Sequence, residues 1–187
     1  MKKLAGIMII AMSLMLSQGS TWANSDRQFQ TVTITSSNTL ALTPPANVKY
    51  VLIDPTASDA AFLKEVIPDE QVVTLTGNAF TQPSGPNGLA LITVGLLNDM
   101  SASNMTLILD SIRIAKLSGD AGFKVKLGFG NPPILLSTGQ EDYAIADGDI
   151  ATTKGAIRGT HKLVVSKTGA VAPGDYDFII VWTGYDA

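Results

Sequence analysis

Residues 175–183 read Asp-Tyr-Asp-Phe-Ile-Ile-Val-Trp-Thr, and this stretch near the end of the chain has its clearest strand pattern. Large apolar side chains stand at every second position, so in an extended strand they share one face. These side chains are Tyr176, Phe178, Ile180 and Trp182. A strand this apolar is normally interior to its sheet, yet only Gly-Tyr-Asp-Ala follows Thr183. We therefore expect an open sheet edge and an exposed core groove beside it.

The rest of the chain alternates short strand patterns with turn-forming residues such as Pro44-Pro45 and Asn131-Pro132-Pro133, which do not fit a strand interior. Many short strands at regular spacing are typical of an all-β sandwich or barrel. The pattern predicts strands at residues 29–35, 39–43, 49–53, 71–76, 89–97, 105–117, 123–129, 134–137, 161–167 and 175–183. The expected fold is an incomplete immunoglobulin-like sandwich that lacks its last strand.

One segment, residues 60–66, is predicted to be helical. Ser58 or Asp59 would cap it, and Phe62 and Val66 lie four residues apart on one helical face. No linker or internal repeat divides the chain. We expect a single sandwich domain over residues 39–187, preceded by an extension at residues 24–38 and a leader at residues 1–23.

The leader has the pattern of a signal peptide. Lys2 and Lys3 precede an apolar run at residues 4–16, and Thr21-Trp22-Ala23 suits a signal peptidase. We expect cleavage between Ala23 and Asn24 and export of the protein. The alternative is a retained membrane anchor, although an apolar run of about 13 residues is short for a span, which needs roughly 20.

Composition excludes several functions. The formal net charge of −3 and the lack of a basic patch argue against nucleic-acid binding. The chain has no cysteine, so burial, strand pairing or partners must supply the stability that disulfides give many exported proteins. No metal or other cofactor is expected, because one histidine and no cysteine make a zinc site improbable.

The candidates for catalysis are few. His161, the single histidine, could act as a general base or metal ligand, but we expect a structural or surface role because no nucleophile motif accompanies it. Glu141-Asp142 and Asp147-Gly148-Asp149 could supply paired carboxylates or calcium ligands. Neither has the ligand number of a calcium loop, so we interpret both as solvated turns. We expect no enzymatic activity.

The N-terminal extension contains a second exposed strand pattern. Its strand-forming residues are Phe29, Gln30, Thr31, Val32, Thr33, Ile34 and Thr35. Val32 and Ile34 share one face, and neither proline nor glycine interrupts the run. This strand could fill the groove beside residues 175–183 of a neighbouring copy, or it could pair within its own molecule. A joint between copies would be head-to-tail and open-ended, and would therefore build a fibre.

These termini resemble those of chaperone–usher pilins, and in particular of the Saf-type group that lacks the pilin disulfide. The resemblance rests on residues 30–34, followed by Ser36-Ser37 and the Leu40 and Leu42 strand, and on residues 174–185. Gly174 lies 14 places from the end and Tyr185 third from last, as is common in these pilins. The middle of the chain matches only by strand pattern.

The resemblance implies a fimbrial subunit that polymerises by donor-strand exchange at the cell surface, with an adhesive surface along the fibre as a further expectation. A periplasmic chaperone would first lend a strand to the groove formed by Tyr176, Phe178, Ile180, Trp182 and Tyr185. An outer-membrane usher would then exchange that strand for residues 29–35 of the next subunit. The resemblance places Val32 and Ile34 in the groove, whereas Phe29 has the opposite parity and would need a bulge to enter.

A host-cell receptor is a further implied partner, whereas membrane insertion is not expected. Two rival functions stay open. One is a monomeric secreted β-sandwich that binds, for example, carbohydrate, although aromatic residues make up only 6 % of the chain. The other is a small secreted hydrolase, which the missing nucleophile–base pair disfavours.

Overall fold

The computed structural model describes residues 40–59, 63–81, 90–148, 150 and 152–186. All of them belong to one of the chain's two compact units, Ser37–Ala187. The predicted cleavage site at Ala23 and Asn24 and the predicted donor strand, residues 29–35, lie outside the described residues. In the part of the chain that the structure describes, no helix has the length and apolarity needed to cross a bilayer.

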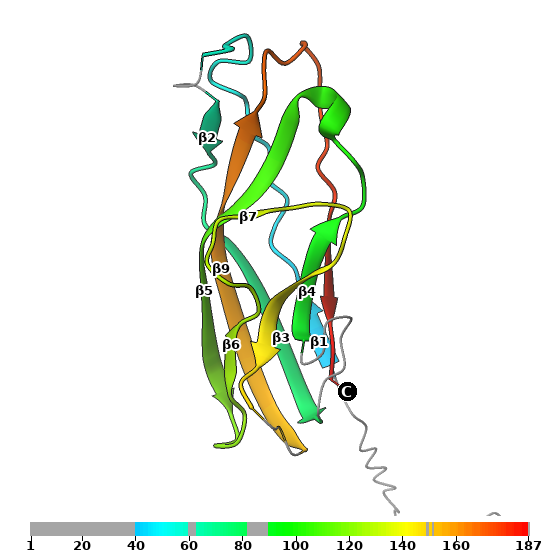
Figure 1. Cartoon of the computed structure of the whole chain (residues 1–187). Helices are drawn as coiled ribbons and strands as arrows, with labels where there is room; N and C mark the ends of the chain where they lie inside the picture. Colours follow the sequence, from blue (N-terminus) through cyan, green and yellow to red (C-terminus); the bar gives the residue numbers. More distant parts are fainter. Residues whose placement is uncertain (1–39, 60–62, 82–89, 149, 151, 187) are drawn as a thin grey trace, which may run out of the picture. The chain divides into compact units, whose positions relative to one another are not determined.

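Two antiparallel sheets form this unit (Figure 1). The first, called the β9 sheet, has the order β1 (Leu40–Thr43), β3 (Gln71–Phe80), β9 (Thr153–Lys167), β5 (Met105–Gly119) and β7 (Ile134–Leu135), and β2 (Lys64–Val66) also pairs with β9. The second, the β4 sheet, has the order β10 (Ile180–Gly184), β4 (Ala90–Leu96), β8 (Glu141–Ala146) and β6 (Val125–Leu127). The predicted all-β sandwich class is confirmed.

The core lies between the inner faces of the two sheets. Leu75 and Ile157 from the β9 sheet and Ile92 and Val94 from the β4 sheet are completely buried. In β3 and β5 the buried residues alternate with more exposed ones, as expected for strands with one face in the core. Most predicted strands appear in the structure, although their ends shift.

Strand β9 begins eight residues before the predicted start at His161, because two glycines hide its first half from sequence analysis. Glycine has low strand propensity. Here a Cβ on Gly155 would lie 2.1 Å from the Phe123 ring, and one on Gly159 would lie 2.3 Å from the Tyr143 ring. Aromatic side chains from neighbouring segments thus fill the space that larger residues in β9 would take.

The predicted helix at residues 60–66 is wrong in its described part. Residues 64–66 form β2, with Glu65 buried and Lys64 and Val66 exposed, which is a period of two rather than 3.6. Residues 60–62 lie outside the described residues. The only helical segment in the described ranges is a short 3-10 turn, Ser101–Ser103.

The predicted turn at Glu141-Asp142 is also wrong, since these residues begin strand β8. Tyr143, Ala144 and Ala146 are buried and anchor this strand, while the charge of Glu141 stays exposed. Asp147 and Gly148 follow as a bend, and Asp149 lies outside the described residues. The buried apolar residues therefore make this segment a strand, and the exposed Glu141 lies on its solvent side.

Candidate functional site: a groove between the sheets

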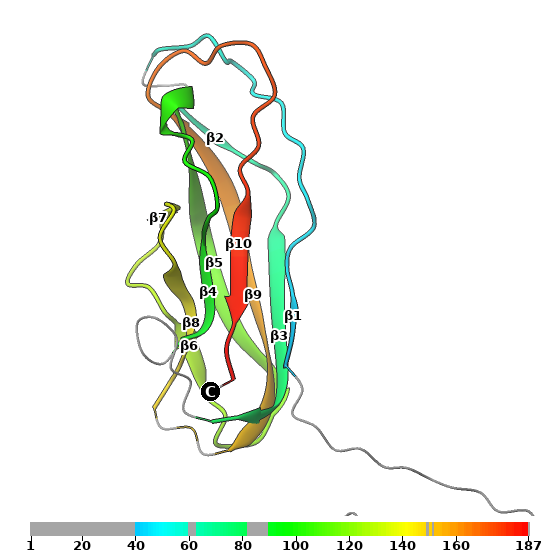
Figure 2. The same ribbon diagram turned by 90° about the vertical axis from the view of Figure 1, so that its right-hand side faces the viewer.

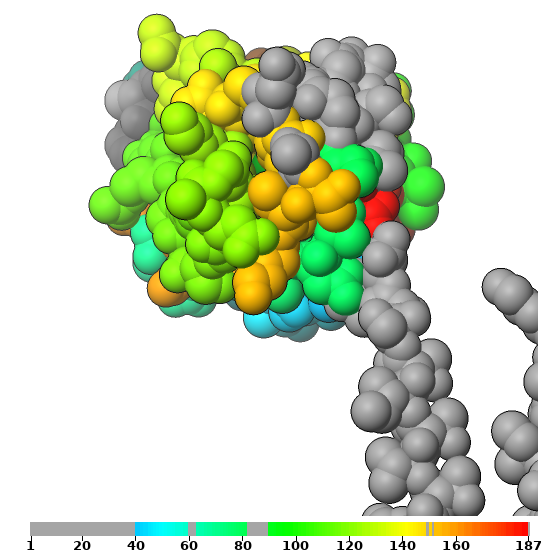
Figure 3. Space-filling view, turned by 90° about the horizontal axis from the view of Figure 1, so that it is seen from below, coloured from blue at the N-terminus to red at the C-terminus, as the bar shows by residue number. Residues whose placement is uncertain are grey.

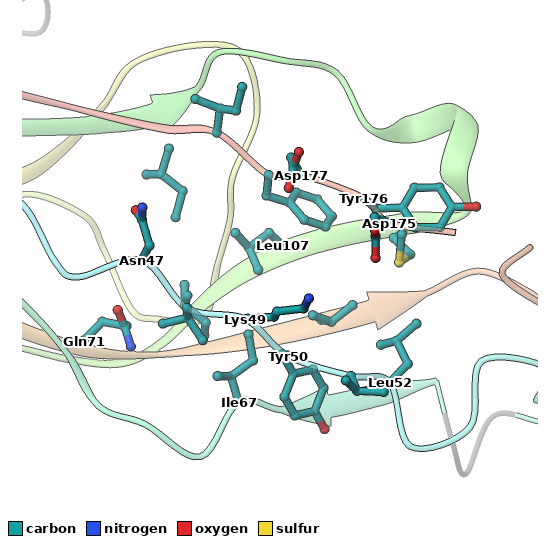
Figure 4. A pocket seen from close by; sticks show the side chains of 18 of the residues that line it. Asn47, Lys49, Tyr50, Leu52, Ile67, Gln71, Leu107, Asp175, Tyr176 and Asp177 are labelled. Carbon is teal, nitrogen blue, oxygen red and sulfur yellow. The ribbon is translucent and has the colours of Figure 1, made fainter. Parts of the chain in front are cut away.

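A groove of about 980 Å³ lies between the two sheets at one end of the sandwich. One wall is residues 44–52, which continue from β1, and the other is residues 172–180, which lead into β10. Figure 2 shows these two segments at the same end of the sandwich, one beyond β1 and the other beyond β10, and Figure 4 shows side chains from both around the pocket. The floor comes from β5, β9 and the residues around Ile67.

The groove is closed at the end where β10 meets β1 and β3. A Cβ on Gly184 would lie 2.7 Å from Leu75 Cδ1 and 3.6 Å from the Cβ of Leu42, so the two sheets approach closely here and a larger residue would require the Leu75 side chain to shift. Just beyond, the Thr81 amide donates to the Asp186 carbonyl at 2.8 Å. At this end of the sandwich the ends of β3, β5 and β9 pack side by side (Figure 3).

The first wall is extended but belongs to no sheet. We predicted a strand at residues 49–53; the alternation is present, but strand pairing is not. Val48, Tyr50 and Leu52 pack against the core, whereas Val51 and Ile53 are 78 % and 83 % exposed. The wall therefore presents every second side chain to the groove, as a strand does.

A buried ion pair fixes this wall. Lys167 Nζ lies 2.8 Å from Glu65 Oε1, and the two side chains are 0 % and 7 % exposed. Glu65 also accepts hydrogen bonds from the Ile53 amide at 2.8 Å and from the Tyr50 hydroxyl at 3.3 Å, while Lys167 donates to the Asp54 carbonyl. Residues 50–54 are thus tied to β2 and β9 through one carboxylate and one ammonium group.

The ion pair also sets the protonation of Glu65. Burial by itself raises the pKa of this carboxyl, but the hydrogen bonds from Lys167 and from the Ile53 and Asp54 amides outweigh burial and hold the pKa below its ordinary value. Burial and the neighbouring Glu65 carboxylate raise the pKa of Tyr50. The carboxylate is therefore charged and the phenol neutral at neutral pH.

The second wall is held by the two residues that follow β4, and the Leu97 amide donates to the Ile179 carbonyl at 2.8 Å. Asn98 Oδ1 accepts from the Ile179 amide at 2.9 Å, and Asn98 Nδ2 donates to the Asp177 carbonyl at 2.7 Å. The Ile179 amide thus bonds a side chain instead of a strand carbonyl, and β10 begins only at Ile180, later than the predicted start at residue 175. In the described part of the chain, no strand pairs with the other edge of β10.

Four predicted groove residues line this groove: Tyr176, Phe178, Ile180 and Trp182. Phe178, Ile180 and Trp182 pack against the core, but Tyr176 is 36 % exposed and donates to the Ala172 carbonyl at 3.0 Å, so the expected buried face is shorter by one residue. Tyr185 does not line the groove; its amide donates to the Leu91 carbonyl at 2.9 Å, beyond the closed end.

The floor is aliphatic except near the closed end. Its apolar members are Ile67, Met105, Leu107, Leu163, Val165 and Val171. Two polar side chains, Gln71 and His161, face each other across the β3–β9 pairing and are 6 % and 1 % exposed. The groove therefore suits an apolar extended chain with one polar position.

His161 lies in the core within an aromatic cluster. Its ring stacks on Trp182 with centroids 5.4 Å apart, and Nδ1 lies 2.9 Å from the Tyr143 hydroxyl oxygen. Burial lowers the pKa of His161 to about 4, so the ring is neutral at neutral pH. Nε2 is buried and has no hydrogen-bond partner among the described residues.

Neither the first wall nor the ion pair that holds it is apparent from the sequence. The alternation of Val48, Tyr50 and Leu52 was visible, but nothing indicated that it would line a groove. Glu65 and Lys167 are 102 positions apart, and each resembles an ordinary surface charge in the sequence.

No cluster of histidine and carboxylate side chains in the described ranges could hold a metal ion. Comparison with protein-family models, with curated proteins and with solved structures found no match to this chain.

Proposed function

We propose that the chain is a fimbrial subunit that polymerises by donor-strand exchange, and that its groove binds an extended strand from a neighbouring copy. The observation that carries the proposal is the groove along the free edge of β10. An edge strand beside an open apolar groove is a binding site for an added strand, which gains backbone hydrogen bonds and buries every second side chain.

The sheet order supports an incomplete immunoglobulin-like fold. In that fold one sheet has the order A-B-E-D and the other contains C, F and G. The order β1-β3-β9-β5 corresponds to A-B-E-D, and the pair β4 and β10 corresponds to C and F. The position of G, beside β10, is where the groove lies. A strand from another copy would therefore complete the fold.

Residues 29–35 are the donor in this proposal. They alternate, with Val32 and Ile34 on one face, which fits the alternating walls and aliphatic floor of the groove. Burial of the two side chains is worth about 1.5–3 kcal/mol each. The eleven residues 27–37 extend to about 36 Å, which is enough to cross a sandwich.

The proposal includes the partners that such assembly requires. A periplasmic chaperone covers the groove before assembly, an outer-membrane usher exchanges the strands, and the fibre reaches the cell surface. The leader at residues 1–23 brings the subunit into the periplasm. Each copy donates at one site and accepts at another, so the contact is head-to-tail and does not close.

The test uses fibres assembled from the exported chain. Deletion of residues 24–37 and the Val32→Asp substitution should each remove the heat-labile, high-mass ladder on gels, because a buried carboxylate cannot occupy an aliphatic groove. Thr33→Asp is the matched control, since its side chain lies on the opposite face of the strand, and its ladder should persist. If the deleted protein still forms ladders, the donor-strand proposal is wrong and a monomeric binding module gains support.

A further inference from the structure

The polar end of the groove identifies how the donor strand is placed, given the proposed function. We infer that Gln30 of one copy binds His161 of the next, with Val32 beside Ile180 and Ile34 beside Phe178. The inference fixes the register of the inserted strand, which the alternation of apolar residues alone leaves open.

His161 lines the floor of the groove, and its Nε2 is buried without a partner among the described residues. When the Tyr143 hydroxyl donates to Nδ1, the neutral ring carries its proton on Nε2. A buried donor without an acceptor is costly. The occupant should therefore bring an acceptor to this position, and the side-chain carbonyl of Gln30 is such a group.

Polar and apolar side chains follow one another in the same order along the groove floor and along the donor strand. Along β9 the core-facing side chains at the groove are His161, Leu163 and Val165, in order away from the closed end. Residues 30, 32 and 34 of the donor are Gln, Val and Ile, which is the same order of one polar and two aliphatic side chains. Both series advance by two residues, or about 6.6 Å, per position.

This placement also determines the direction of the donor strand. Residue numbers along β10 decrease away from the closed end, from Gly184 to Ile180. With Gln30 at the closed end, the donor's numbers increase in that direction, so it runs antiparallel to β10. Every strand pair in the described sheets is antiparallel as well. Because His161 stacks on Trp182, Gln30 lies opposite Trp182, and Val32 then lies opposite Ile180.

Disulfide mapping tests this register directly, because the chain has no cysteine of its own. Val32→Cys chains mixed with Ile180→Cys chains should give a disulfide-linked band containing one copy of each. Val32→Cys mixed with Phe178→Cys is the matched control, shifted by two residues, and should give little. A dominant band in the control would overturn the register while leaving donor-strand exchange intact. If the wild-type chain forms no fibres, or if ladders persist after deletion of residues 24–37, the proposed function itself is wrong.

A double-mutant cycle tests the hydrogen bond. Gln30→Leu leaves Nε2 unpaired and should speed fibre dissociation about tenfold, and His161→Leu should do the same by burying an unpaired amide. The combined Gln30→Leu/His161→Leu chain removes both partners, so dissociation should return close to the wild-type rate. If His161→Leu speeds dissociation only by damaging the fold, adding Gln30→Leu will not restore the wild-type rate, and the inference is wrong. Thr33→Leu combined with His161→Leu is the control, for which no rescue is expected.

Discussion

Lys167 has a fully buried ammonium group whose acidic partner is Glu65. Removal of one member of a buried pair leaves the other charge without compensation. We therefore expect Lys167→Met to lower the free energy of unfolding by about 3–5 kcal/mol in urea denaturation. The chain should also lose order at residues 50–54, which the pair holds.

Two variants control for this effect. The pair formed by Lys126 and Asp147, at 3.0 Å, is about half exposed on both sides, so Lys126→Met should cost less than about 1 kcal/mol. Glu65→Leu combined with Lys167→Met removes both buried charges and should regain most of the lost stability. Equal losses for Lys126→Met and Lys167→Met would contradict a special role for the buried pair.

Because His161 is buried, we expect the free energy of unfolding to depend on pH. Burial lowers its pKa to about 4, from an ordinary value of 6.5, so the unfolded chain binds a proton more readily than the folded chain between these pH values. The contribution of neutral His161 to the free energy of unfolding is complete above pH 6.5 and is lost as the pH falls to 4. We expect a fall of about 3 kcal/mol over this interval in denaturant titrations.

His161→Gln should flatten the curve between pH 4.5 and 6.5. Below that interval Glu65, whose pKa is lowered, also loses its contribution as it is protonated, so the two groups act in different windows. An unchanged slope between pH 4.5 and 6.5 in the His161→Gln chain would show that other groups are responsible.

At the scale of elements, the groove wall before β10 depends on Asn98. Asn98→Ala removes the acceptor for the Ile179 amide and the donor to the Asp177 carbonyl. We expect hydrogen exchange of the Ile179 amide to become about tenfold faster. The Val181 amide is the internal control, because Val181 pairs with Gly95 inside the β10–β4 ladder. Equal acceleration at both positions would indicate global destabilisation.

The sequence predicts elements well where burial alternates along one strand. β3 and β5 are predicted for this reason and their inner faces form part of the core, whereas β4 is buried along its whole length. The errors have physical causes. Residues 64–66 are predicted to be helical from the four-residue spacing of Phe62 and Val66, but Val66 is exposed and the single inward residue is Glu65. The partner of Glu65, Lys167, is remote in the sequence, so its burial is not apparent there. The first half of β9 contains glycines, which have low strand propensity, and the sequence does not show that aromatic rings from other segments pack against them.

For the whole molecule, the sequence predicts one half of the candidate site. The alternating apolar residues near the C-terminus indicate a strand with an open edge, and the structure places Phe178, Ile180 and Trp182 along a groove. The opposite wall and the polar floor could not be predicted, because they depend on which strands become neighbours. Gln71 and His161 meet only because β3 pairs with β9 in one register.

Trp182 gives the groove an optical property. The chain has two tryptophans, Trp22 and Trp182, and the first lies in the leader that we expect to be removed. The remaining indole would stack on His161 and stand edge-on to Tyr143, with its centroid 5.0 Å from the Tyr143 ring, at the position where Gln30 would enter. Its emission would then arise from a single place in the subunit. Strand exchange could be followed in real time by the fluorescence of Trp182, without an added dye.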